Sequence, residues 1–380
     1  MKCFKNATVY VDGIGLQKRN VYFDKKIEKI SRFGIKKADE IILPEDAIVL
    51  PGFIDQHVHG AGGSDAMDGT TCDLAVIADT LAKEGTTSFL ATTMTQSKDN
   101  IVKALGAVKV YREENREDGA RLIGVHLEGP FIAEKHKGAQ PLEYIAEPNV
   151  ETFKEYNDAS GGAIKIVTLA PEHPSSKDLI EYLTENNIVS SIGHTDAGYN
   201  DVIEAIKRGA NNVTHTFNAQ KPLHHREIGV VGSAMLLDEL NCELIADTIH
   251  VSVPAMKLLI KSKGKNNVIL ITDAMRAKGL PDGESELGGQ KVFVRGGEAR
   301  LQDGTLAGSV LRMNRAIENL VKKVGVSFTD AVDFATINPA RLLGIDREFG
   351  SIKVGKKADF AVINGNFDII LTIKEGKVLW

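Results

Sequence analysis

Eight apolar, β-branched runs alternate with helical stretches along most of this chain, and this alternation constrains its fold more than any other feature. The runs cover residues 48–54, 86–93, 122–127, 163–169, 188–192, 212–214, 242–246 and 268–272. Several are apolar almost throughout, as expected for strands buried on both faces of a parallel sheet. Amphipathic stretches at 74–84, 100–113, 178–186 and 201–208 predict covering helices. Such a succession of units favours a (β/α)8 barrel over an open sheet.

The two ends of the chain carry a different pattern. Short alternating segments within 8–34 and 350–380, broken by Gly, Asn and Asp, predict β-hairpins without helices. The simplest arrangement is a small β-sandwich domain built from both termini, residues 1–50 plus 346–380, with the barrel at 51–345 between them. A β-rich stretch near 287–306 predicts an insertion after the eighth barrel strand.

Composition and charge exclude several classes of partner. The 380-residue chain has 43% hydrophobic and 26% charged residues, as in ordinary globular proteins. Its formal net charge of −5 gives no basic footprint for nucleic acid. No apolar run approaches the ~18 residues that a membrane span requires. From these two observations we expect a protein that binds neither nucleic acid nor membranes. The three widely spaced cysteines predict free thiols in a reducing compartment, so we expect the protein to be cytoplasmic.

Ionisable residues gather where the predicted barrel strands end. They are His57 and His59 after the first run, Glu128 after the third, His194 after the fifth, His215 after the sixth, Asp247 and His250 after the seventh, and Asp273 after the eighth. The carboxyl ends of barrel strands share one mouth, where such enzymes carry their active sites. Packing alone explains this arrangement poorly, because ionisable groups are rarely buried without partners.

The residue types at these strand ends predict a metal-dependent hydrolase. His57 and His59 point to the same side of an extended strand, close enough to bind one cation. Imidazole and carboxylate ligands without thiolates suit zinc, iron, manganese or cobalt. Such a cation lowers the pKa of bound water to ~7 and so generates hydroxide at neutral pH. Asp273 is then available as general base and acid.

The other histidines have simpler interpretations. His126 lies two residues before Glu128 and is expected to be a hydrogen-bonded core residue. His136 follows a charged stretch and is expected to face solvent, and His224 and His225 are expected to lie in a loop.

Several strings around these residues resemble the amidohydrolase superfamily. The pair His57-Val58-His59 after Pro51-Gly52-Phe53-Ile54-Asp55, together with His194, His215 and Asp273, carries that resemblance. Narrower strings are similar to the N-acetylglucosamine-6-phosphate deacetylase family. They are His126-Leu127-Glu128-Gly129-Pro130-Phe131, Gly193-His194-Thr195-Asp196-Ala197, His215-Thr216-Phe217-Asn218-Ala219, Arg226-Glu227 and Thr272-Asp273-Ala274-Met275. The resemblance covers essentially the whole chain, and it implies hydrolysis of the acetamide of N-acetyl-D-glucosamine 6-phosphate to glucosamine 6-phosphate and acetate.

The resemblance implies roles for individual residues. Glu128, His194 and His215 would bind the main metal ion. Asp273 would deprotonate the attacking water and later protonate the departing amine. His250 would bind the sugar.

For the 6-phosphate, the resemblance implies the backbone of Asn218 and Ala219 together with Arg226, which in the family reaches across from a partner subunit. A homodimer is therefore expected. A planar guanidinium and backbone N–H groups suit a phosphate dianion. Gly308 and its neighbours are expected to close over the substrate.

The chain departs from the family pattern at one position. Some members place a histidine shortly after a Lys-Gly pair to polarise the acetyl carbonyl, and here Gln140 stands in the matching stretch. Its amide can still donate to a developing oxyanion. Members also differ in whether His-x-His is present. His57 and His59 here predict a second metal site bridged by Glu128, so one or two divalent metals are expected per subunit.

Three alternatives stay open at this point. Deacetylation of N-acetylgalactosamine 6-phosphate is the nearest, because nothing in the sequence fixes the C4 epimer. A cyclic amidase of the same superfamily would commonly carry a carboxylated lysine where Glu128 stands, and it would have less use for Arg226. A non-catalytic scaffold is disfavoured, because Glu128, His194, His215 and Asp273 are all present.

Overall fold

A parallel barrel forms the centre of the molecule. The computed structural model describes residues 1–11, 13–34 and 37–380, and within them eight parallel strands pair in the order β15-β14-β13-β12-β11-β10-β9-β6. Their bounds are β6 (Phe53–Val58), β9 (Thr86–Thr92), β10 (Arg121–Glu128), β11 (Ile164–Leu169), β12 (Val189–Ile192), β13 (Asn212–Val213), β14 (Asn241–Ile245) and β15 (Val268–Ile271). The barrel closes beyond β15, where Asp273 N donates to His57 O at 2.8 Å and Val58 bridges Ala274. The predicted barrel is confirmed.

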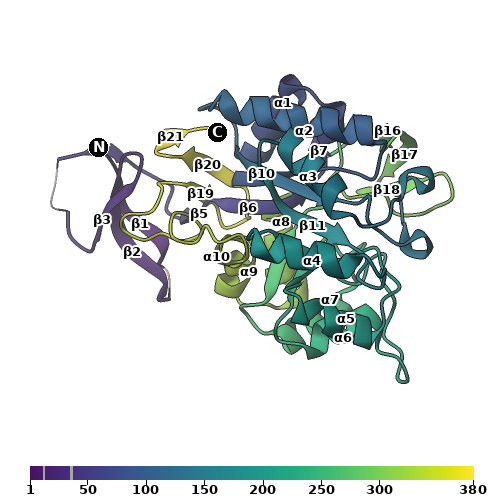
Figure 1. Cartoon of the computed structure of the whole chain (residues 1–380). Coiled ribbons are helices and arrows are strands. Elements are labelled where there is room, and N and C mark those ends of the chain that lie inside the picture. Colours follow the sequence, from purple (N-terminus) through teal and green to yellow (C-terminus); the bar gives the residue numbers. More distant parts are fainter. Residues whose placement is uncertain (12, 35–36) are drawn as a thin grey trace.

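Helices cover the outside of the barrel (Figure 1). They are α1 (Thr71–Ala82), α2 (Lys98–Glu113), α3 (Val150–Ala159), α4 (Ser176–Glu185), α5 (Tyr199–Lys207), α6 (Gly229–Leu236), α7 (Val253–Lys263), α8 (Met313–Asn319), α9 (Phe328–Phe334) and α10 (Ile337–Leu342). Side-chain caps start several of them; Thr70 accepts from Asp73 N before α1, and Ser97 from Asn100 N before α2. Among the described helices, none has the length and apolar character needed to cross a membrane.

Strands from both termini form a separate sheet beside the barrel (Figure 1). They are β1 (Lys2–Val11), β2 (Gly15–Phe23), β3 (Ile27–Ser31), β4 (Asp39–Ile41), β5 (Ile48–Pro51), β19 (Phe360–Ile363), β20 (Ile369–Lys374) and β21 (Lys377–Val378). Phe4, Phe23 and Phe360 form its small core, with ring centroids 5.0–5.3 Å apart. The expected β domain from both ends is thus confirmed as a separate sheet. Residues 12, 35 and 36 of the predicted terminal segment lie outside the described residues.

The first predicted run, 48–54, belongs to two sheets rather than one. Its first part is β5, which pairs with β1 and β19 in the terminal sheet, and the barrel strand β6 starts only at Phe53. The chain passes between the sheets at Gly52, where a Cβ would lie 2.2 Å from Thr87 Oγ1. Only glycine fits this close approach, and the apolar pattern continues through it because both strands are buried.

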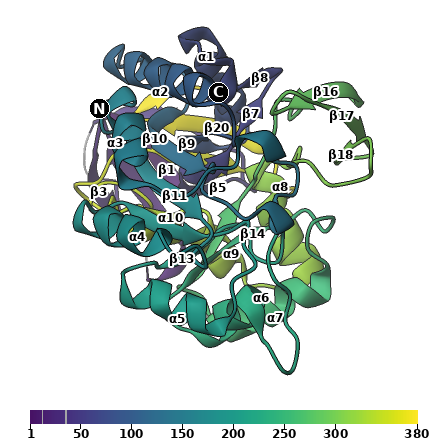
Figure 2. The same cartoon turned by 45° about the vertical axis from the view of Figure 1, so that its right-hand side comes forward.

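Shorter elements lie near the carboxyl ends of the barrel strands. They are β7 (Gly60–Ala61), β8 (Ser64–Asp65), η1 (Ala66–Asp68), η2 (Glu134–His136) and η3 (Leu142–Tyr144). One more, η4 (Leu320–Val324), continues α8 in the outer helix layer. A three-stranded antiparallel sheet, β16 (Gly283–Leu287), β17 (Gln290–Arg295) and β18 (Glu298–Leu301), follows β15 and stands to one side of the barrel (Figure 2). Its apolar face packs on Met94 and Met275, so this insertion forms one wall of the barrel mouth.

Candidate active site

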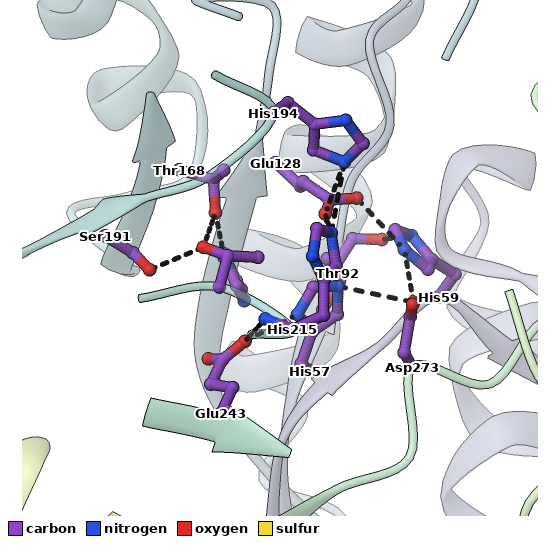
Figure 3. Close-up of polar contacts among 12 residues, drawn as sticks. His57, His59, Thr92, Glu128, Thr168, Ser191, His194, His215, Glu243 and Asp273 are labelled. Carbon is purple, nitrogen blue, oxygen red and sulfur yellow. Dashed lines mark hydrogen bonds and ion pairs between the residues drawn. The ribbon is translucent and has the colours of Figure 1, made fainter. Parts of the chain in front are cut away.

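Glu128, at the end of β10, lies at the centre of a ring of imidazoles (Figure 3). Its Oε1 is 3.0 Å from His215 Nε2, 3.3 Å from His194 Nε2 and 3.5 Å from His57 Nε2. Its Oε2 is 3.2 Å from His59 Nε2. All five residues are buried. We call Glu128, His194 and His215 the outer triad, and His57, His59 and Glu128 the inner triad; each brings its ligand atoms within 4.8 Å of one another.

Sharp turns at the strand ends aim several of these side chains into the mouth. His194 follows β12 with φ of 48°, His215 follows β13 with φ of 28°, and Asp273 follows β15 with φ of 48°. Positive φ is uncommon for residues with a Cβ and is concentrated at functional sites. The backbone conformation therefore supports a functional role for these three residues.

Hydrogen bonds fix how three of the imidazoles face the centre. His194 Nδ1 lies 2.9 Å from the His136 carbonyl oxygen, and His59 Nδ1 lies 3.2 Å from that of Thr92. His57 Nδ1 lies 3.0 Å from Glu243 Oε2. A neutral imidazole that donates from Nδ1 keeps a lone pair on Nε2, which is the atom a metal ion would bind.

The lone pairs and carboxylates at the centre fit a cation. His194 Nε2 and His215 Nε2 are only 3.1 Å apart, and His57 Nε2 is buried with no hydrogen-bond partner among the described residues. Burial by itself would lower the histidine pKa values, but Glu128 and Asp273 raise the pKa of His57 well above its usual range and that of His59 to about 9. The cluster thus requires positive charge, which a divalent cation supplies while leaving the imidazoles neutral.

Asp273 lies beside the inner triad. Its Oδ1 is 3.4 Å from His57 Nε2 and 3.2 Å from His59 Nε2. Burial opposes its ionisation, but the attraction of these imidazoles lowers the pKa of Asp273 to about 2. In the same way, burial is outweighed by His57, His194 and His215, which hold the pKa of Glu128 well below its usual range. Both groups are carboxylates at neutral pH, so Glu128 can bind a cation and Asp273 can accept a proton.

Gln140 is tied to the carboxylate at the centre. Its Nε2 donates to Glu128 Oε2 at 2.9 Å, and its Oε1 accepts from Thr95 N at 2.8 Å. The amide proposed from the sequence as an oxyanion donor therefore orients Glu128 in this structure. It still lines the cavity and is 3% exposed.

The remaining predicted residues divide between the cavity and the surface. His250, Asn218, Ala219 and Gly308 line the cavity together with the outer triad, His59 and Asp273, whereas His57 lies beneath it. Arg226 is exposed in a loop and does not line the cavity of its own chain.

His250 is held at the cavity wall by Asp247, whose Oδ2 lies 2.6 Å from His250 Nδ1. Burial by itself would lower the pKa of His250, but Asp247 raises it above its usual value. The pair therefore favours an imidazolium facing the cavity.

The predictions for two further histidines, His126 and His136, have different outcomes. His126 is fully buried, with Nδ1 3.2 Å from Gln56 O and Nε2 2.7 Å from Thr168 Oγ1. His136 does not simply face solvent: its side chain is 16% exposed and its Nε2 lies 2.9 Å from Asp196 Oδ1. The expected exposure was wrong because residues 134–136 form a turn that packs on the loop after β12.

Sequence reasoning missed Glu243, which lies inside β14 directly below the imidazoles. Its carboxylate is fully buried and accepts from Gln56, His57, Asn212 and the backbone N of His215. The available signal was a charged residue in an otherwise apolar run, which is rarely buried without partners.

Comparisons with known proteins agree with this geometry. The amidohydrolase family matches residues 48–379 of the chain. An N-acetylglucosamine-6-phosphate deacetylase from Bacillus subtilis (strain 168) is 46% identical over 359 residues, 93% of this chain and 91% of its own length. An N-acetylgalactosamine-6-phosphate deacetylase from Escherichia coli O157:H7 is 36% identical over 322 residues, 85% of each chain. The crystal structure of N-acetylglucosamine-6-phosphate deacetylase from Pasteurella multocida superposes with a TM-score of 0.93 at 29% identity, covering 99% of both chains.

Proposed function

The chain belongs to the amidohydrolase family, and we propose that it removes the acetyl group from N-acetyl-D-glucosamine 6-phosphate, releasing glucosamine 6-phosphate and acetate. The observation that carries the proposal is the central carboxylate of Glu128, which faces four imidazoles at the barrel mouth with Asp273 beside them. The deacetylases from Bacillus subtilis and Pasteurella multocida support the choice of substrate, because the likeness to each spans nearly the whole chain.

The outer triad would hold the main divalent metal ion, and the inner triad a second one that shares Glu128. This donor set suits zinc or iron, and also manganese or cobalt. A bound divalent cation supplies Lewis-acid chemistry, polarising the amide carbonyl and making water acidic enough to attack near neutral pH.

Asp273 would move the protons of the reaction. Its carboxylate accepts one proton as water adds to the acetyl carbon, and it then donates that proton to the amide nitrogen. The C–N bond breaks as the amine leaves, so that acetate and the free amino sugar are formed. Because both inner imidazoles contact Asp273 Oδ1, the carboxylate is held at the centre of the mouth throughout.

The far side of the cavity would bind the sugar phosphate. His250 would donate to the sugar, the backbone of Asn218 and Ala219 would face the 6-phosphate, and Gly308 would close over the ligand. Arg226, exposed on its own chain, would reach the phosphate in the neighbouring subunit of a homodimer.

We also infer a cytoplasmic location. Cys3, Cys72 and Cys242 are free thiols, which suits a reducing compartment.

The second candidate substrate is the C4 epimer, N-acetylgalactosamine 6-phosphate. The Escherichia coli O157:H7 relative, named for that sugar, favours it, although at lower identity than the Bacillus subtilis relative. A cyclic amidase is disfavoured, since Glu128 stands where those enzymes commonly carry a carboxylated lysine.

Acetate release tests this proposal. Purified protein of known metal content is assayed with both epimeric sugar phosphates and with unphosphorylated N-acetylglucosamine. Acetate release should be fastest from the glucosamine epimer, and it should be much slower from the unphosphorylated sugar than from its 6-phosphate. Faster release from the galactosamine epimer would reverse the order of the two candidates, and equal rates with and without phosphate would remove the role of Arg226.

A further inference from the structure

Glu243 is a buried carboxylate that neither triad includes. It lies on β14 in the floor of the barrel mouth, on the side of His57 away from His194 (Figure 3). Its side chain is fully buried, and four donors surround its two oxygens. A fully buried acceptor of this kind requires such partners.

The two oxygens of Glu243 are occupied by donors. Oε2 accepts from His57 Nδ1 at 3.0 Å and from His215 N at 3.2 Å. Oε1 accepts from Gln56 Nε2 at 2.8 Å and from Asn212 Nδ2 at 3.3 Å. The same carboxylate thus contacts one side-chain ligand of the inner triad and the backbone of one ligand of the outer triad.

The contact with His57 decides which nitrogen of that ring is free. With the proton on Nδ1 facing Glu243, Nε2 keeps its lone pair and points toward Glu128 and Asp273. That nitrogen is buried and has no hydrogen-bond partner in the part of the chain that the structure describes. Two carboxylates attract positive charge to this nitrogen, and a divalent cation between them would bind the Nε2 lone pair in place of a proton.

The corresponding contacts of His59 and His194 are made by the main chain. Both rings face backbone carbonyl oxygens, those of Thr92 and His136. Of these three rings, only His57 is oriented by another side chain. Its orientation can therefore be removed by one substitution without touching a ligand.

A cation site made of His57, His126 and Glu243 is the competing interpretation, since these three side chains also cluster. Both nitrogens of His126 already have partners. The acceptor positions of Glu243 are occupied as well. This group therefore supports the site above it and does not form another.

We propose that Glu243 is a positioning residue that fixes the tautomer and orientation of His57, and so determines whether the chain holds a second metal ion in the inner triad. The inference rests on the proposed metal-dependent function. Outer-shell partners of this kind typically change metal affinity by ~10–100-fold when removed.

The test counts bound metal. Chelator-stripped protein is titrated with Co²⁺ and followed by visible absorption and elemental analysis, with acetate release measured in parallel. The wild-type protein should bind two ions per chain. Glu243→Met has similar length and no carboxylate acceptor, and its second site should be about 100-fold weaker. At the lowest Co²⁺ concentration that fills both wild-type sites it should therefore bind one ion, and its absorption should match that of the outer triad in His57→Ala.

Glu243→Gln is the conservative variant. Its amide oxygen can still accept from His57, while its amide nitrogen would face Gln56 and Asn212. The side-chain oxygens of these two residues have no partner among the described residues, so their amides can rotate to accept from the new nitrogen. This variant should retain the second ion with affinity weakened by about 10-fold. If Glu243→Met does not fold, the affinity of Glu243→Gln for the second ion is the deciding measurement. An affinity equal to that of the wild-type protein would then overturn the proposal.

Thr168→Val is the matched control. It removes a buried hydroxyl in the same floor, bonded to His126 and Thr214 but not to His57, and it should retain both ions. Two ions in Glu243→Met at wild-type affinity would overturn the proposal, as would a wild-type protein that binds only one. A wild-type protein that binds two ions, loses one in Glu243→Met and releases no acetate from any substrate would support this inference while contradicting the proposed function.

Discussion

The inner and outer triads share Glu128, yet the protein holds them in different ways. The outer histidines, His194 and His215, occupy positive-φ turns just past their strands, and their side chains are 7% and 5% exposed to the mouth. The inner His57 lies within β6 itself and is 0% exposed, supported from below by Glu243. The outer histidines therefore face the cavity, whereas His57 is part of the barrel floor.

A histidine pair that is close in sequence therefore need not be the most accessible part of a site. The inner pair is the most visible motif of the chain, but only His59 of the two lines the cavity, whereas His57 is fully buried beneath it. The outer pair is assembled from separate loops and lines the cavity next to Asn218 and Ala219.

Asp273→Asn gives the largest expected effect. Asp273 touches the inner histidines but belongs to neither triad, so this variant should lose turnover while keeping its metal. We expect kcat to fall by about 1,000-fold, within the ~10²–10⁴-fold that positioned acid–base catalysis contributes. Acetate release and elemental analysis measure the two quantities separately. Normal turnover would remove Asp273 from the mechanism, and loss of metal would make it a ligand.

Removing one ligand from each triad tests the comparison directly. His194→Ala should lose the outer ion and most of the activity, whereas His57→Ala should lose the inner ion and lower kcat less. Both losses should be at least as large as the ~10–100-fold that removal of an outer-shell partner costs. His173→Ala, a histidine 34% exposed and outside the cavity, is the control for loss of an imidazole. Equal losses from the two triads would show that both ions act alike, contrary to the difference in burial.

Asp247→Asn should have the smallest effect. It tests whether His250, on the cavity wall, acts as a charged group. Because Asp247 raises the pKa of His250, the imidazolium persists to higher pH than in a free histidine. Binding of an anionic substrate to this imidazolium is present below that pKa and lost as pH rises through it. The variant should move this loss in kcat/KM to lower pH by about one unit. An unchanged pH profile would show that His250 acts as a neutral group.

The strand pattern and the strand-end residues were predictable from the sequence because they obey local rules. Strands buried on both faces need continuous apolar runs, and a barrel places all their carboxyl ends at one mouth. This is why Glu128, His194, His215 and Asp273 could be brought together before any coordinates. The exception was the run 48–54, whose two strands share one unbroken apolar pattern, so that only the contact of Gly52 with Thr87 marks the change of sheet.

The barrel, the β sheet built from both termini and the residue types at the mouth follow from the order of residues along the chain, because buried strands and helices leave periodic apolar patterns. Which side-chain atoms come into contact follows from the folded arrangement instead. It placed Gln140 on Glu128, His136 against Asp196, and Glu243 beneath His57. These contacts join residues up to 186 positions apart, and their geometry depends on strand register and on turns with positive φ, which no local pattern specifies.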